Sequence, residues 1–181
     1  MKKQLPYKNR KKGFTLIETL VAIFVLLVST TGPLTFAQSG LRSSFLARDQ
    51  IVAFYLAQDA IETIKSMRDN SSIQGNDWLA GIPVQCFTAG QKCQIDTIGN
   101  VEVTTCSSGG CDPLRLNNNN QFGVGGSGPA SQYTRTLYLS EIVNDREAQI
   151  IVDVSWDTNF LSDRSIIVQE NVYNWVPIFS Q

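Results

Sequence analysis

The stretch KKGFTLIETLVAIFVLLV, residues 11–28, decides how the rest of the chain is organised. Two lysines and a glycine end abruptly at Phe14, where an apolar run begins. That run contains one ionisable side chain, Glu18, four residues after Phe14. A carboxylate inside a membrane segment costs roughly 2.5–3.5 kcal/mol on insertion scales. A membrane segment that keeps such a group usually has a use for it, so Glu18 is the first candidate functional residue.

The charge of the chain is divided unevenly about this stretch. Residues 1–13 hold six basic side chains and no acidic one, which leaves nine of the 15 basic and all 16 acidic side chains in residues 14–181. Basic residues ahead of an apolar span stay on the cytoplasmic side, so we expect the C-terminal part to be exported. The net charge of −7 on that part argues against nucleic-acid binding, which uses basic surfaces.

The residue order at this junction resembles the N-terminus of type IV prepilins and of type II secretion pseudopilins. In that family a membrane peptidase cleaves after the glycine, here Gly13, and the new N-terminal residue, here Phe14, is N-methylated. The fifth mature residue of the family is a glutamate, here Glu18. The resemblance implies four partners: a prepilin peptidase, other pilin or pseudopilin subunits, the membrane and an assembly platform with its ATPase. It implies no enzymatic activity, no cofactor and no metal.

The resemblance also bears on the role of the protein. Residues 18–26, ETLVAIFVL, look closer to minor subunits of this family than to major ones. The implied product is a structural subunit of a type IV pilus or a type II secretion pseudopilus. It would sit in the cytoplasmic (inner) membrane as a single-pass protein and reach a cell-surface filament on assembly. The alternative is a membrane-anchored or secreted binding domain, such as an adhesin, that uses a pilin-type anchor.

Residues 1–13 are expected to be a leader that is removed, and residues 14–37 a transmembrane helix. A helix of 24 residues is about 36 Å long and so crosses a hydrocarbon core of about 30 Å. Pro33 lacks the amide that would bond to Ser29, which predicts either a helix end there or a kink within a longer helix. An ordinary secretory signal cleaved after Ala37 fits less well, because Glu18 interrupts its apolar core.

An amphipathic continuation of the helix is expected over residues 38–70. Apolar side chains recur there at steps of three and four, which is the spacing of one helix face. They are Ala53, Ala57, Ala60, Ile61, Ile64 and Met67. We expect this stripe, and Ile61 and Ile64 in particular, to lie under a sheet.

The sheet is expected in residues 132–181. Three β-branched and aromatic runs, 133–140, 148–156 and 165–173, are joined by short connections and predict an antiparallel meander. The aromatic side chains Trp156, Tyr173 and Trp175 are interpreted as core residues. A long N-terminal helix on a C-terminal antiparallel sheet gives an α+β fold, which also resembles that of pilins.

Residues 71–131 are expected to be irregular and rich in cysteine, glycine and asparagine. Two short runs, 94–96 and 101–103, alternate as strands do. Residues 117–129 form a polar, glycine-rich loop, interpreted as a connector in preference to a binding loop.

Four clustered cysteines in an exported chain predict two disulfides. Of the three possible connectivities we favour Cys86–Cys93 and Cys106–Cys111, because both close short loops. A zinc site of four thiolates is the alternative, but the six residues between Cys86 and Cys93 exceed the usual spacing of a zinc knuckle. The connectivity stays open at this point.

Catalytic sets are not apparent in the sequence. The chain has no histidine, so no Ser-His-Asp or Cys-His pair is possible, and it has no P-loop. Asp153, Asp157 and Asp163 could meet at one end of the meander and bind calcium through oxygen atoms. Without a tight acidic loop, we favour carboxylates exposed to water in turns.

Overall fold

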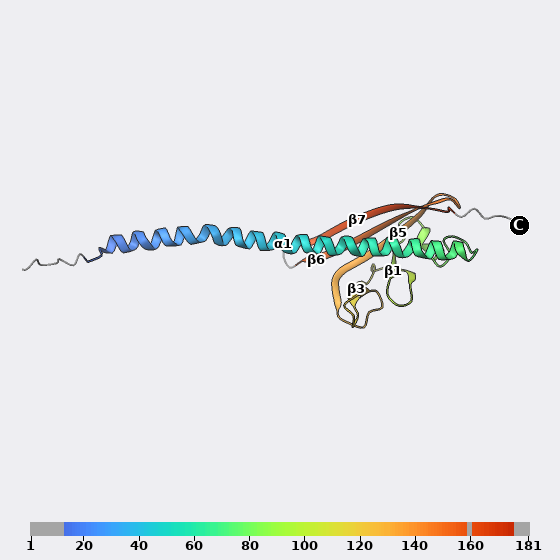
Figure 1. The fold of residues 1–181 in the computed structure, drawn as a ribbon, viewed down its shortest axis with the longest axis horizontal. Coiled ribbons are helices and arrows are strands. Elements are labelled where there is room, and N and C mark those ends of the chain that lie inside the picture. Colours follow the sequence, from blue (N-terminus) through green and yellow to red (C-terminus); the bar gives the residue numbers. More distant parts are fainter. Residues whose placement is uncertain (1–12, 159–160, 176–181) are drawn as a thin grey trace, which may run out of the picture. The chain divides into compact units, whose positions relative to one another are not determined.

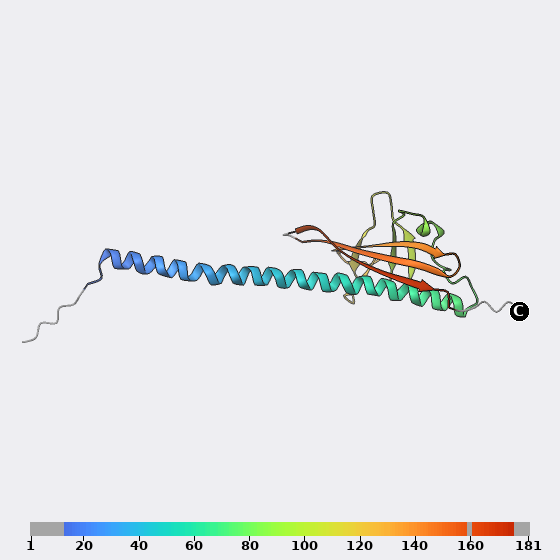
Figure 2. The same cartoon turned by 90° about the horizontal axis from the view of Figure 1, so that it is seen from above.

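The computed structural model describes residues 13–158 and 161–175. It divides into two compact units, residues 1–47 and 48–181, and each is described by itself (Figures 1 and 2). The helix α1, Leu16–Ile73, begins in the first unit and ends in the second.

The first unit is helical from Leu16 onward, and the helix passes Pro33 without a break. The sequence leaves open whether the helix ends or bends at this proline. The structure excludes a helix end there, because α1 continues to Ile73. Hydroxyl groups in the same region donate to carbonyls of the preceding turn, with Ser29 Oγ bonding the Leu26 oxygen at 2.9 Å and Thr35 Oγ1 the Gly32 oxygen at 2.8 Å. These hydroxyl groups therefore satisfy their hydrogen bonds within the helix, which suits a lipid environment.

The second unit holds an antiparallel sheet. Its strands are β1 (Cys93–Asp96), β2 (Glu102–Thr105), β3 (Pro113–Leu116), β4 (Phe122–Gly123), β5 (Ala130–Val143), β6 (Glu147–Thr158) and β7 (Leu161–Tyr173). One edge of β5 pairs with β1 and β3 in turn, and its other edge pairs with β6, which pairs with β7. The expected meander is therefore present as β5, β6 and β7.

The C-terminal half of α1 supplies the cover for one face of this sheet. Its buried residues are Ala53, Leu56, Ala57, Ala60, Ile61 and Ile64. This is the expected stripe with Leu56 added, except that Met67 is only partly buried. Against them lie the alternate residues of β5 and β6 that include Leu137, Ile150, Val152 and Val154, all fully buried. The prediction that Ile61 and Ile64 are buried is confirmed, with exposed fractions of 3% and 0%.

The segment expected to be irregular contributes more structure than the sequence indicates. It contains a 3-10 turn at Val84–Phe87 and the strands β1 to β4, which extend the meander into a larger sheet. β1 and β2 overlap the runs 94–96 and 101–103, which alternate as strands do in the sequence. β3 and β4 were not predicted, because four and two residues are too few for an alternating pattern to stand out. Pro113 begins β3, a position where a strand tolerates proline.

The glycine-rich loop is packed closely against its neighbours. Asp96 at the end of β1 accepts hydrogen bonds from the amides of Ile98 at 3.1 Å and Gly125 at 2.9 Å. A Cβ added at Gly128 would lie 2.0 Å from the carbonyl oxygen of Leu116. A glycine is required at Gly128 because the backbone of β3 approaches it, so this loop is a fixed part of the sheet edge.

The three aromatic residues expected in the core have different environments. Trp156 is buried, with 6% exposed, whereas Tyr173 and Trp175 are 54% and 58% exposed. The interpretation as core residues was thus wrong for Tyr173 and Trp175. Tyr173 ends the edge strand β7, and Trp175 follows it. Both contact the end of α1 through polar atoms: Trp175 Nε1 donates to Asp69 Oδ1 at 3.3 Å, and the Tyr173 carbonyl accepts from Arg68 Nη1 at 3.4 Å.

Candidate functional site

The junction between Gly13 and Phe14 lies just before α1. Gly13, Phe14 and Thr15 are not helical, and Thr15 caps the helix that follows. Its carbonyl oxygen accepts from the amides of Glu18 at 3.1 Å and Thr19 at 3.2 Å, and its Oγ1 lies 3.4 Å from the Glu18 amide. The side chain of a threonine at this position satisfies an amide that the first helical turn leaves unpaired.

The fold of the chain does not explain why residue 13 is a glycine. A Cβ added there would meet no heavy atom within 4 Å, and the residue does not have a positive φ. The side chain of Phe14 is 79% exposed. A glycine and an exposed phenylalanine that contribute nothing to folding are consistent with recognition by another protein.

Glu18 lies in the first turn of α1 and is exposed. A carboxylate is favourable there because the N-terminal end of a helix carries a partial positive charge. Among the ion pairs formed by described residues, none involves Glu18.

The sequence of this site holds a further signal, which marks the start of α1. The order Thr15-Leu16-Ile17-Glu18 is that of a capping box, with threonine at the cap and glutamate three residues later. The structure shows the threonine half of that arrangement, and the box gives the start of the helix from sequence alone.

The apolar residues after Glu18 remain uncovered within the chain. Phe24, Leu27 and Leu34 are 67%, 60% and 60% exposed. α1 is long and apolar enough to cross a membrane. An exposed apolar surface of this length is typical of a segment that lies in lipid or packs against an apolar partner.

Residues 8–32 match the family model of the prokaryotic N-terminal methylation motif, which is the signature of type IV pilins and pseudopilins. The N-terminal part of the chain thus carries the motif found in type IV pilins and pseudopilins. The match covers the junction, Glu18 and the larger part of the span, so it includes the site described above. No curated protein and no solved structure gives a significant match to the chain.

The four cysteines of the chain form two disulfides. The structure joins Cys86 to Cys93 and Cys106 to Cys111, which are the pairs that the sequence analysis favours. Cys86 and Cys93 are fully buried, whereas Cys106 and Cys111 are only partly so. No thiolate remains to bind zinc, because each sulfur is bonded to another sulfur.

Arg135 is a buried charged residue of the second unit. Its side chain is 0% exposed. From β5 it reaches α1, where Nη1 donates to the Leu56 carbonyl at 3.0 Å and to Asp59 Oδ2 at 3.1 Å. It also reaches β1, where Nη2 donates to the Ile95 carbonyl at 2.8 Å. Burial lowers the pKa of Arg135, and Asp59 raises it. The residue is structural, since it joins α1 to β5 and β1.

The calcium alternative gains no support from the described residues. No group of three acidic, cysteine or histidine side chains in that part of the chain could hold a metal ion. The side chain of Asp163 lies outside the described residues. Asp153 is half-buried in the face of β6 opposite α1, and burial raises its pKa, while a hydrogen bond from Ser165 and the charge of Lys92 lower it.

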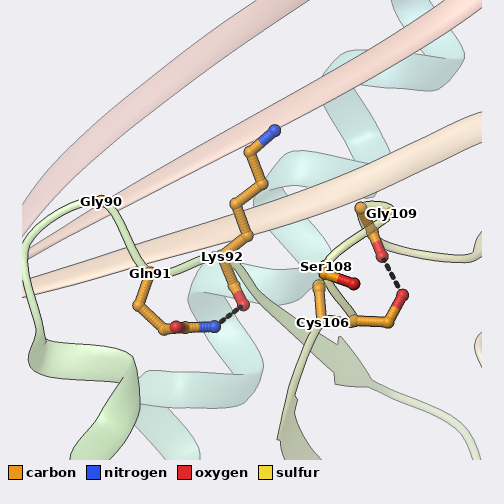
Figure 3. Close-up of a pocket in the computed structure, with 8 residues that line it drawn as sticks. Gly90, Gln91, Lys92, Cys106, Ser108 and Gly109 are labelled. Carbon is orange, nitrogen blue, oxygen red and sulfur yellow. Dashed lines mark hydrogen bonds between the residues drawn. The ribbon is translucent and has the colours of Figure 1, made fainter.

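A polar hollow of about 450 Å³ lies beside the Cys106–Cys111 disulfide (Figure 3). Its side chains are already engaged with their own loops: Gln91 Nε2 donates to the Lys92 carbonyl at 3.0 Å, and Ser107 Oγ to the Gly110 carbonyl at 3.1 Å. Lys92 extends its ammonium away from Gln91 and Ser108. The hollow brings together no nucleophile and base, so its lining indicates no catalytic chemistry.

Proposed function

We propose that this protein is a structural subunit, a pseudopilin or minor pilin, of a type IV pilus or a type II secretion pseudopilus. The observation that carries the proposal is the N-terminal junction. Gly13 and Phe14 precede a capped apolar helix, and neither has a role in the fold of the chain. The match to the methylation motif covers these residues.

Processing gives the junction its chemistry. A prepilin peptidase removes residues 1–13 by hydrolysing the bond between Gly13 and Phe14, and the new amine of Phe14 is methylated. A methylated amine keeps its positive charge. The mature chain then presents a cation at residue 14 and a carboxylate four residues later, at Glu18.

Glu18 acts as an assembly contact in this proposal. A carboxylate in hydrocarbon is costly, and an opposite charge in a medium of low dielectric constant recovers much of that cost. The Phe14 amine of a neighbouring subunit supplies the charge when a filament forms. The pair fixes the axial position of one subunit against the next, so Glu18 has a role in positioning and none in catalysis.

The second unit would be the extracytoplasmic body of the subunit. Two disulfides suit an oxidising compartment outside the cytoplasm. Before assembly, the span holds the chain in the cytoplasmic membrane, and the assembly platform then extracts it into the filament.

Mass spectrometry of the mature protein tests this proposal. The chain should begin with methylated Phe14, and Gly13→Val should leave an uncut precursor in the membrane. Because a Cβ at Gly13 meets nothing in the fold, failure of processing in this variant cannot be assigned to misfolding. A mature chain that begins at Gln38 would show cleavage by an ordinary signal peptidase and would contradict the proposal.

A further inference from the structure

The two flanks of α1 in the second unit differ. β7 and the region of β1 and β3 lie on opposite sides of the helix (Figure 1). On the β7 side, Lys65 forms an ion pair of 2.5 Å with Glu170, and Arg68 Nη1 donates to the Tyr173 carbonyl at 3.4 Å. On this flank, cations of α1 are therefore already bound to residues of β7.

The other flank is open and forms what we call the acidic groove. It consists of two hollows of about 340 Å³ each that share Asp59, between one side of α1 (Val52 to Asn70) and residues of the sheet side. The sheet side includes Ile98, Val101 and Phe122. From residue 52 to residue 70 the helix rises about 27 Å, which is long enough to seat several turns of a second helix.

The groove combines apolar surface with negative charge. Tyr55 and Val101, which line it, are 65% and 44% exposed. Asp59 and Glu62 are its charged residues, with side chains 50% and 72% exposed, and no lysine or arginine is among its described lining residues. Asp59 is paired with the buried Arg135, whereas Glu62 forms, among the described residues, only an exposed pair of 3.3 Å with Lys65 of the same helix, so Glu62 is the carboxylate that an incoming cation can reach. It therefore suits a helix that carries an apolar stripe beside a cation.

The chain itself contains such a helix segment. In residues 41–48 of α1, the positions Leu41, Phe45 and Arg48 follow at steps of four and three, so they share one face. Leu41 and Phe45 are 62% and 58% exposed. This segment offers an apolar stripe and a cation, Arg48, that can compete with Lys65 for the exposed Glu62.

We propose that the acidic groove binds residues 41–48 of a second copy of this chain. The inference rests on the proposed function, because the two copies must be neighbours in a filament. Their helices run parallel, since each copy enters the membrane through its N-terminal part. With Arg48 of one copy at Glu62 of the other, Leu41 lies opposite Tyr55, and both pairs are 14 residues apart in α1.

This register has a mechanical requirement. A shift of 14 residues along a helix is about 21 Å. Two copies that span the same membrane at the same depth cannot meet in this way. The contact forms only when one copy has been raised relative to the other, so it would stabilise subunits after extraction and leave them separate in the bilayer.

Photocross-linking of the full-length protein tests the inference. Benzoylphenylalanine is placed at Tyr55 and, as a matched control of similar exposure on the β7 flank, at Tyr173. Irradiated filaments should give an adduct of twice the subunit mass from position 55 and little from position 173. Peptide mapping should place the adduct in residues 41–48.

Charge exchange adds a second measurement. Glu62→Arg alone and Arg48→Glu alone should each lower the adduct yield about two- to five-fold, as expected for loss of a partly exposed ion pair. The double variant should restore the yield, because it reverses both charges. Loss of yield without restoration would overturn the pairing of Arg48 with Glu62.

The outcomes separate this inference from the proposed function. Filaments that contain the chain but show no adduct, an adduct elsewhere, or an adduct with a different subunit overturn the inference alone. If the chain begins at Phe14 and yet is absent from filaments, both the filament role and the inference fail.

Discussion

Arg135 Nη1 donates a hydrogen bond of 3.0 Å to the backbone carbonyl of Leu56, so a buried cation of the sheet is fixed to the main chain of α1. The same guanidinium reaches Asp59 on α1 and the Ile95 carbonyl on β1. One side chain therefore holds the helix, the central strand and the first short strand in a single arrangement. Asp59, its charged partner, also lines the acidic groove.

Truncation of Arg135 should destabilise the protein strongly. Arg135→Ala leaves the Leu56 and Ile95 carbonyls without this donor and opens a cavity, and we expect a loss of about 3–5 kcal/mol in the free energy of unfolding. Thermal or denaturant unfolding with the disulfides intact measures it. Arg146→Ala, at an exposed arginine, is the matched control and should change stability by less than about 0.5 kcal/mol. Equal melting of both variants would show that Arg135 does not hold the interface.

The disulfides should be found as Cys86–Cys93 and Cys106–Cys111 in peptides mapped without reduction. Loops this short are worth roughly 2–3 kcal/mol each in the chain-entropy model, so Cys86→Ser with Cys93→Ser should lower stability by about that amount. Mild reductant should open Cys106–Cys111 first, because the other pair is buried. Four free thiols, or zinc bound in stoichiometric amount, would refute the pairing.

Asp153 should make stability depend on pH. Burial raises its pKa in the folded state, so the folded protein binds a proton more tightly than the unfolded chain does. The charged carboxylate then costs stability at pH 7, and this cost disappears as the pH falls through the raised pKa toward the unfolded value of about 4. Asp153→Asn should melt higher than the parent at pH 7, and the difference should shrink on acidification. A variant that melts lower at pH 7 would mean that the Ser165 and Lys92 interactions outweigh burial.

Glu18→Val should leave cleavage and membrane insertion intact while it reduces incorporation into filaments. Glu18→Asp should be intermediate, because its shorter side chain reaches less far. The ratio of subunit in sheared filaments to subunit in membranes measures the effect. A ratio for Glu18→Val equal to that of the parent would mean that the carboxylate does not set the position of the subunit.

Periodicity was enough to predict the helix and the long strands. The stripe around Ile61 and Ile64 recurs at helical steps, and β5, β6 and β7 alternate over eight residues or more. The structural role of Arg135 could not be predicted from periodicity. Alternation places it on the inward face with Leu137, yet its partners are carbonyl oxygens of residues 40 and 79 positions away, which no local pattern reveals.

The candidate site differs from the fold in this respect. Gly13, Phe14 and Glu18 lie within the matched methylation motif, so their spacing is visible in the sequence and hardly depends on tertiary structure. The acidic groove has the opposite character. It arises where Tyr55 and Glu62 of the helix meet Ile98 and Phe122 of the sheet side, and residues this far apart in the chain are brought together only by folding.

Both disulfides close local loops, and neither links α1 to the sheet. A pilus under tension would load each subunit through its helix, so the boundary between helix and sheet would bear the pull through packed side chains and the Arg135 contacts. Such contacts can slip under force and form again when it ceases, whereas a covalent link there would hold rigidly until it broke. In such a filament the helix–sheet boundary would yield and recover, while the loops closed by the two disulfides, residues 86–93 and 106–111, would keep their shape.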